Sequence, residues 1–311
     1  MKQAPLTDYT GPMPPWPDLA KYVQRVSLPR VRLTLHLYDT HDLDLPSALL
    51  LHGLGDEADT WRHIIEPLSA SFRVIAPDLP GFGRSDGPAS GYTVPFFCQA
   101  LLELLQALEL SKTTLIGHSL GGLISHAITL DHPQLVAGLV LVSGSLVSRS
   151  QRLNLLSLLF MVPGLGEWMY NHLRMDPQVA YASLEPYYHD LEGLPPRDRD
   201  FLYKRVNQRV WSDKQRRAYF STLRNLVPYA LNQQRGLGAR LANLATPTLA
   251  IWGQDDQIMP PVNGRALAEM QPSAHLVMIP NAGHNIQQDR PQALLDAVFS
   301  DERIVPQTDN S

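Results

Sequence analysis

The sequence predicts an α/β fold in which a mostly parallel sheet carries a helical insertion. Short apolar runs typical of strands alternate with amphipathic helical segments along most of the chain. The alternation stops between residues 146 and 235 and then resumes. With 311 residues, of which 44% are hydrophobic, the chain is long enough for one large domain or for a core domain with an insertion.

The first part of the expected sheet lies within residues 1–145. Residues 1–20 are expected to form a loose arm. Two antiparallel strands then precede four short, apolar strands of the kind that parallel sheets bury. The expected strands are 23–27, 31–38, 48–51, 73–76, 113–116 and 139–142, with helices at 59–70 (interrupted by Pro67) and 94–110.

The second part of the chain completes the eight-stranded sheet. Strands are expected at 248–252 and 276–279, each followed by a helix, at 262–270 and 291–299. The predicted organisation is a core domain of residues 1–145 and 236–311 and a helical cap of residues 146–235 after the sixth strand. Residues 301–311 are expected to form a frayed tail.

The composition and the absence of certain motifs argue against several classes of function. The net charge of −4 provides no basic field for nucleic acid. The single cysteine, Cys98, has no internal partner for a disulfide, and the N-terminus lacks the apolar core of a signal peptide. No His or Cys pairs at zinc spacing and no dinucleotide loop are present. We therefore expect a cytoplasmic protein that has no membrane span, metal or cofactor, while its oligomeric state stays open.

A glycine-rich turn at residues 117–121 is the centre of the predicted site. Gly117, Ser119 and Gly121 form a Gly-x-Ser-x-Gly pattern between the β-branched run 113–116 and a segment of helical character that starts at Leu120. Such a strand-to-helix corner is typical of a nucleophile elbow, where the serine takes a strained backbone conformation. The pattern predicts Ser119 as a nucleophile at a helix N-terminus, whose dipole favours developing negative charge.

A serine nucleophile needs a base that accepts its proton and a carboxylate that orients the base. In an open α/β sheet these groups are expected on loops at the carboxyl ends of strands. His284 follows the last expected strand in a loop of small residues, and we predict it as the base. Asp255 and Asp256 both follow strand 248–252, and by position alone both are candidates for the acid.

Together these motifs resemble the α/β-hydrolase superfamily, in its branch with a lid, over residues 25–300. The resemblance includes His52-Gly53-Leu54-Gly55, the turn around Ser119, and Trp252-Gly253-x-x-Asp256-x-x-x-Pro260. In that family the acid lies three residues after the glycine, which implies Asp256 rather than Asp255.

The same resemblance implies an oxyanion hole made of two backbone N–H groups. One belongs to Leu120, after the nucleophile, and the other to Leu54. Gly53 and Gly55 let the backbone approach a substrate closely, and His52 is interpreted as a structural residue that holds its loop.

The family resemblance implies a carboxylesterase that acts through an acyl-enzyme on short- to medium-chain or aromatic acyl groups. Relatives that hydrolyse carbon–carbon bonds in aromatic degradation usually carry Asn before the serine and Trp after the histidine. This chain has His118 and Asn285 at those positions, so that alternative is less favoured but open. A receptor with slow turnover on the same fold is a further alternative. Candidate pocket residues are His118, Phe160, Trp168, Tyr187 and Trp211.

Overall fold

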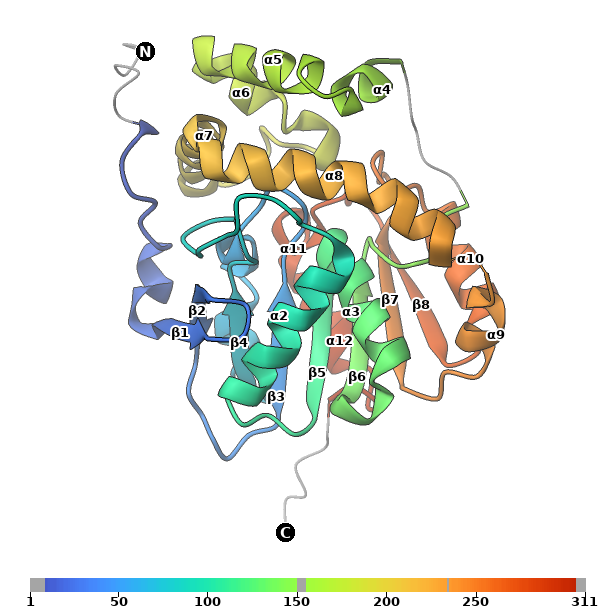
Figure 1. The fold of residues 1–311 in the computed structure, drawn as a ribbon. Helices are drawn as coiled ribbons and strands as arrows, with labels where there is room; N and C mark the ends of the chain where they lie inside the picture. Colours follow the sequence, from blue (N-terminus) through green and yellow to red (C-terminus); the bar gives the residue numbers. More distant parts are fainter. Residues whose placement is uncertain (1–8, 150–154, 234, 306–311) are drawn as a thin grey trace.

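The fold is a single mixed sheet with helices on both faces. Within residues 9–149, 155–233 and 235–305, which the computed structural model describes, eight strands follow the order β1-β2-β4-β3-β5-β6-β7-β8 (Figure 1). β2 pairs antiparallel with β1 and with β4, and the other neighbours are parallel. The predicted mostly parallel sheet is confirmed. The strands are β1 (Val23–Leu28), β2 (Leu33–Asp39), β3 (Ser47–Leu51), β4 (Arg73–Pro77), β5 (Thr113–His118), β6 (Val136–Val142), β7 (Thr248–Gly253) and β8 (Ala274–Ile279).

The register of the parallel strands brings their carboxyl ends to one edge of the sheet. His118 at the end of β5 pairs with Val142 of β6, which in turn pairs with Ile251 of β7. Gly253 of β7 pairs with Ile279 of β8. The loops that follow these strands therefore meet at one edge, as ligand sites in open α/β sheets do.

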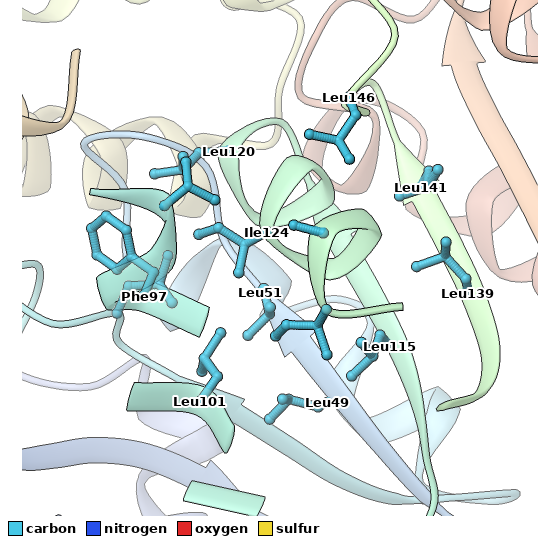
Figure 2. Close-up of a cluster of buried hydrophobic side chains, with 14 of the residues drawn as sticks. Leu49, Leu51, Phe97, Leu101, Leu115, Leu120, Ile124, Leu139, Leu141 and Leu146 are labelled. Carbon is cyan, nitrogen blue, oxygen red and sulfur yellow. The ribbon is translucent and has the colours of Figure 1, made fainter. Parts of the chain in front are cut away.

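Two layers of apolar side chains hold the helices on the sheet. Alternate residues of a strand face opposite layers, so Leu49 and Leu51 pack with α2 (Val94–Ala107) and α3 (Leu120–Asp131), as Figure 2 shows. Leu50 instead packs in the layer under α12 (Pro291–Phe299). The remaining core helices are α1 (Ile65–Leu68), α9 (Leu237–Ala242), α10 (Val262–Met270) and α11 (Ile286–Asp289).

Three expectations about local structure are wrong. In place of the single helix expected at 59–70, the chain forms a short 3-10 turn, η3 (Ala58–Trp61), followed by α1. In this segment Asp59 accepts a hydrogen bond from Tyr38, and Arg62 donates one to Asp198, so both side chains bind residues far away in the sequence. Residues 9–20 of the expected loose arm are packed: Trp16 is 3% exposed and contacts Phe201 edge to face. In the expected tail, Asp301 and Ile304 are buried. Residues 1–8 and 306–311 lie outside the described residues.

Helices inserted between β6 and β7 lie across the edge of the sheet where the loops meet. Figure 1 shows α7 and α8 nearest the sheet, with α4, α5 and α6 outside them. In the described part of the chain, no helix is both long and apolar enough to cross a membrane. The inserted helices are α4 (Leu155–Met161), α5 (Leu165–His172), α6 (Pro177–Ala182), α7 (Pro196–Trp211) and α8 (Asp213–Gln233), with a 3-10 turn η6 (Glu185–Tyr187).

Two arginines of α7 bind acidic residues in the loop after β3. Arg209 donates to both carboxylate oxygens of Glu57, at 2.7 Å each, and also to Asp56. The Nε of Arg205 lies 3.2 Å from Glu57, and its Nη2 lies 3.3 Å from Asp59. The three carboxylates are buried. We call these five residues the α7 clamp, because they attach α7 to the loop that begins at His52.

Buried histidines make the fold sensitive to acid. Burial lowers the pKa of His36 and of His126 to about 4, and that of His118 to about 3, from 6.5. The unfolded chain therefore binds more protons than the folded chain below pH 6.5, and the free energy of unfolding falls as the pH drops toward 4.

Replacement of His126 tests this acid sensitivity. His126→Leu is expected to reduce the loss of unfolding free energy between pH 7 and pH 5 by about 1–2 kcal/mol, because one buried proton acceptor is gone. Urea denaturation followed by tryptophan fluorescence measures the change. The exposed His172, replaced in the same way, serves as control. Equal pH dependence in the His126 and His172 variants would contradict the assignment.

Candidate active site

Ser119 occupies the turn between β5 and α3. Its backbone has φ +52° and ψ −113°, a conformation that L-residues rarely adopt. Its N–H donates to the carbonyl of Val142 at 2.9 Å, and its carbonyl accepts from Leu123 at 3.0 Å. The strained turn is therefore held from β6 on one side and from α3 on the other.

Close backbone approach around Ser119 explains the glycines. A Cβ on Gly121 would overlap the carbonyl oxygen of Leu51, and one on Gly117 would overlap the backbone of Gly121. A Cβ on Gly144, which follows β6, would overlap the backbone of Ser119 itself. Gly144 was missed in the sequence because it belongs to no part of the Gly-x-Ser-x-Gly pattern.

Asp256 and His284 lie next to each other on the loops after β7 and β8. Asp256 Oδ2 is 2.9 Å from His284 Nδ1, and Asp256 Oδ1 accepts from the N–H groups of Ile258 and Met259 at 2.9 and 2.8 Å. Burial alone would raise the pKa of Asp256, but the neighbouring His284 and the Met259 N–H keep it below its usual value of 3.8. The ionised Asp256 therefore orients the ring of His284 through its Nδ1. The other ring nitrogen of His284, Nε2, takes no part in this contact.

Asp255 faces away from this pair. It is exposed, and its Oδ2 lies 2.8 Å from Nδ1 of His189. The structure thus brings Asp256, and not Asp255, to His284.

Matched substitutions of the two aspartates test their roles. Asp256→Asn is expected to lower kcat by about 10³- to 10⁴-fold, because the amide no longer holds His284 in the tautomer that accepts a proton at Nε2. Asp255→Asn is expected to change kcat less than about 2-fold, because only an exposed ion pair is lost. Steady-state ester hydrolysis measures both. Equal losses would contradict the assignment of the acid.

The loop after β3 is held beside Ser119. Nε2 of His52 accepts from the N–H of Leu79 at 2.8 Å, and its Nδ1 is 2.8 Å from the carbonyl oxygen of Gly53. A Cβ on Gly53 would lie 3.2 Å from the Cβ of Ser119. His52 therefore links two loops and has no ring nitrogen left for proton transfer.

Two backbone N–H groups at this position are candidates for binding an oxyanion. The N–H of Leu54 has no acceptor within the described residues. Leu120 is the first residue of α3, where a helix leaves its N–H groups unpaired. Gly55, the next loop residue, has φ +79°.

His118, which precedes Ser119, is buried against His284. Its Nε2 donates to the carbonyl oxygen of His284 at 3.1 Å, and the two ring centroids are 4.8 Å apart. Because burial lowers the pKa of His118 to about 3, the ring is neutral near pH 7. His118 thus supports the loop of His284 and does not compete for protons.

The other predicted pocket residues fall into two groups. Tyr187 lies with its ring centroid 5.9 Å from that of His284, and Phe160 packs against Tyr219 at 6.1 Å. Trp168, in contrast, is 59% exposed and stacks edge to face on His172, and Trp211 contacts Arg174. Unlike Tyr187, neither tryptophan has a ring contact with His284 within the described residues.

Tyr219 and Tyr170 were not predicted as site residues. Tyr219, on α8, reaches the loop after β3, where its Cδ2 would lie 3.1 Å from a Cβ on Gly55. Tyr170, on α5, stacks at 5.9 Å on Tyr219. Their contacts join segments far apart in sequence, so no local pattern marks them.

Comparisons with known proteins agree with this architecture. A family model for the alpha/beta hydrolase fold matches residues 46–291. An uncharacterized protein of Mycobacterium tuberculosis is 29% identical over 275 residues, which cover 85% of this chain and 76% of the relative. A 2-hydroxy-6-oxononadienedioate/2-hydroxy-6-oxononatrienedioate hydrolase of Escherichia coli is 29% identical, covering 86% of this chain and 90% of that protein. The crystal structure of a carboxylesterase of Bacillus subtilis superimposes with a TM-score of 0.71 at 23% identity, covering 89% and 90% of the two chains.

Proposed function

Because the chain belongs to the alpha/beta hydrolase fold family, we propose that it is a serine hydrolase that cleaves carboxylic esters through an acyl-enzyme on Ser119. The observation that carries the proposal is the 2.9 Å contact between the buried Asp256 and His284, on loops that meet the strained turn of Ser119. A nucleophile, a base and an orienting carboxylate are the minimum set for this chemistry.

In the first half of the proposed reaction, Oγ of Ser119 attacks the ester carbonyl carbon while His284 accepts the hydroxyl proton. The N–H groups of Leu54 and Leu120 bind the oxyanion of the tetrahedral intermediate. Fixed donors of this kind contribute roughly 3–4 kcal/mol each in comparable enzymes. His284 then gives its proton to the leaving alkoxide, and the acyl group remains on Ser119.

In the second half, a water molecule attacks the acyl-enzyme while His284 accepts one of its protons. The second tetrahedral intermediate breaks down, the carboxylic acid leaves, and the proton returns from His284 to Ser119. The ionised Asp256 stabilises the imidazolium in both halves, in line with its lowered pKa. No cofactor or metal enters this scheme.

We propose residues 146–235 as the cap and residues 1–145 and 236–311 as the core. Tyr187, beside His284, and Phe160, which packs on Tyr219, then belong to the cap, and their rings favour apolar acyl groups of medium length or aromatic acyl groups.

Hydrolysis of a carbon–carbon bond is a second candidate. It is favoured by the 29% identity to the Escherichia coli hydrolase over 86% of this chain. The same nucleophile and base serve both reactions, so the candidate site alone does not separate them.

Hydrolysis of p-nitrophenyl esters from acetate to laurate tests the proposal. We expect turnover of about 1 s⁻¹ or faster, with an optimum at medium chain length. A single stoichiometric burst followed by almost no turnover would contradict an esterase. Consumption of a 2-hydroxy-6-oxo-dienoate under the same conditions would then support the second candidate.

A further inference from the structure

Three tyrosines from three different elements of the proposed cap converge above the candidate site. Tyr170 lies on α5, Tyr187 on η6 and Tyr219 on α8. Tyr170 and Tyr219 have ring centroids 5.9 Å apart, while Tyr187 is 5.9 Å from the ring of His284. Tyr219 also contacts the position of Gly55, next to the proposed oxyanion donor. We call these three residues the tyrosine roof.

The hydroxyl groups of the tyrosine roof have no hydrogen-bond partner among the described residues, although each residue is only partly accessible to solvent. The hydroxyls of two other deep tyrosines, Tyr92 and Tyr188, do have partners. The hydroxyl of Tyr92 donates to the carbonyl of Pro88 at 2.6 Å, and that of Tyr188 to Gln288 at 3.0 Å. Because these three hydroxyls have no acceptor in the described part of the protein and remain within reach of solvent, each can donate to a ligand bound beside the candidate active site.

The surroundings define the kind of acceptor. Burial raises the pKa of Tyr170 to about 12, and raises that of Tyr187 and of Tyr219, so all three remain O–H donors at neutral pH. Guanidinium groups near Tyr170, including Arg174 and Arg209, are themselves paired with carboxylates. The ligand therefore meets neutral donors rather than a free positive charge, which suits a carbonyl oxygen.

Aromatic packing around the hydroxyls makes the rest of the roof apolar. Phe160 contacts Tyr170 and Tyr219 at 6.4 and 6.1 Å between ring centroids, and Phe220 contacts the same two rings at 5.7 and 5.3 Å. The surroundings of the donors are therefore apolar, which favours a hydrocarbon chain or ring over a group with many polar atoms.

We propose that the tyrosine roof selects substrates that carry a carbonyl oxygen on an otherwise apolar group, several bonds away from the ester that Ser119 attacks. This inference rests on the proposed esterase function. It assigns specificity, and no proton transfer, to Tyr170, Tyr187 and Tyr219.

Two matched pairs of substrates test the proposal. p-Nitrophenyl 6-oxoheptanoate and p-nitrophenyl heptanoate differ by one remote carbonyl on the acyl side. 4-Oxopentyl benzoate and pentyl benzoate differ in the same way on the alcohol side. For at least one pair, the wild type is expected to favour the oxo ester about 10-fold in kcat/KM, because unpaired donors gain an acceptor.

Tyr-to-Phe substitutions in the tyrosine roof remove the hydroxyl groups and keep the aromatic rings. Tyr170→Phe, Tyr187→Phe and Tyr219→Phe, singly and together, are expected to abolish the preference, measured in each variant as the ratio of kcat/KM for the oxo ester to kcat/KM for the plain ester. Tyr181→Phe is the control, because Tyr181 is another cap tyrosine with an unpaired hydroxyl but packs against Tyr203 instead of the roof. Circular dichroism of each variant verifies the fold.

The outcomes separate the two proposals. If the plain esters are hydrolysed but neither oxo ester is preferred, or if the triple variant keeps the preference, the roof assignment is overturned while the esterase stands. If no ester of either pair is turned over, the esterase function fails, and the roof assignment that rests on it fails as well.

Discussion

Ser119→Ala is expected to lower kcat/KM for p-nitrophenyl esters by about 10⁴-fold or more, because no other group in the proposed reaction can form the acyl-enzyme. The fold should remain, since the side chain of Ser119 donates no hydrogen bond within the described residues and alanine fits the same turn. We expect a change of less than about 1 kcal/mol in the free energy of unfolding.

A second serine on the same helix provides the matched control. Ser125 lies within α3, is buried, and has an Oγ without a partner in the described part of the chain. Ser125→Ala should therefore keep kcat/KM within about 2-fold of the wild type. Residual activity above one tenth in the Ser119 variant would show that another residue is the nucleophile.

Arg209→Ala is expected to destabilise the protein by about 3–5 kcal/mol, since it leaves buried carboxylates without their main cation. Although burial opposes the charge of Arg209, the carboxylates of Asp56 and Glu57 raise its pKa, so the guanidinium stays charged in this buried position. Because Asp56 is two residues from Leu54, the displaced loop should also reduce ester hydrolysis. Urea denaturation and steady-state kinetics measure the two effects.

Arg199 is the matched control on the same helix. Its partner is Glu192, at 2.9 Å, and both side chains are at least 36% exposed. Because solvent screens an exposed ion pair, the pair contributes little to the stability of the fold. Arg199→Ala should therefore change the free energy of unfolding by less than about 0.5 kcal/mol. If Arg209→Ala were as mild as Arg199→Ala, the α7 clamp would have no role in holding the cap.

Local patterns in the sequence predicted the sheet and the turn around Ser119. These features depend on residues that are neighbours in the chain: the apolar strand runs, the Gly-x-Ser-x-Gly pattern and two of the helices. The helices expected at 262–270 and 291–299 have the same bounds as α10 and α12. The choice between Asp255 and Asp256 needed the family spacing, because both follow the same strand. In the structure they separate through contacts with different histidines.

Long-range contacts account for what the sequence did not predict. Trp16 is buried because Phe201 covers it, and Tyr219 approaches Gly55 because α8 crosses the edge of the sheet. The charged residues of α7 resemble a solvated helix face until the acidic loop after β3 is placed against them. Hydrophobic periodicity describes one element at a time and therefore does not identify partners of this kind.

The insertion of the proposed cap between β6 and β7 also sets the order in which the residues of the candidate site are synthesised. Ser119 is synthesised early, whereas Asp256 and His284 arrive after the whole cap, on the last two strands of the sheet. Until β8 pairs with β7, a nascent chain has the proposed nucleophile without the proposed base, His284. The proposed mechanism therefore requires nearly all of the chain, and an incomplete translation product that lacks β8 is expected to be inactive.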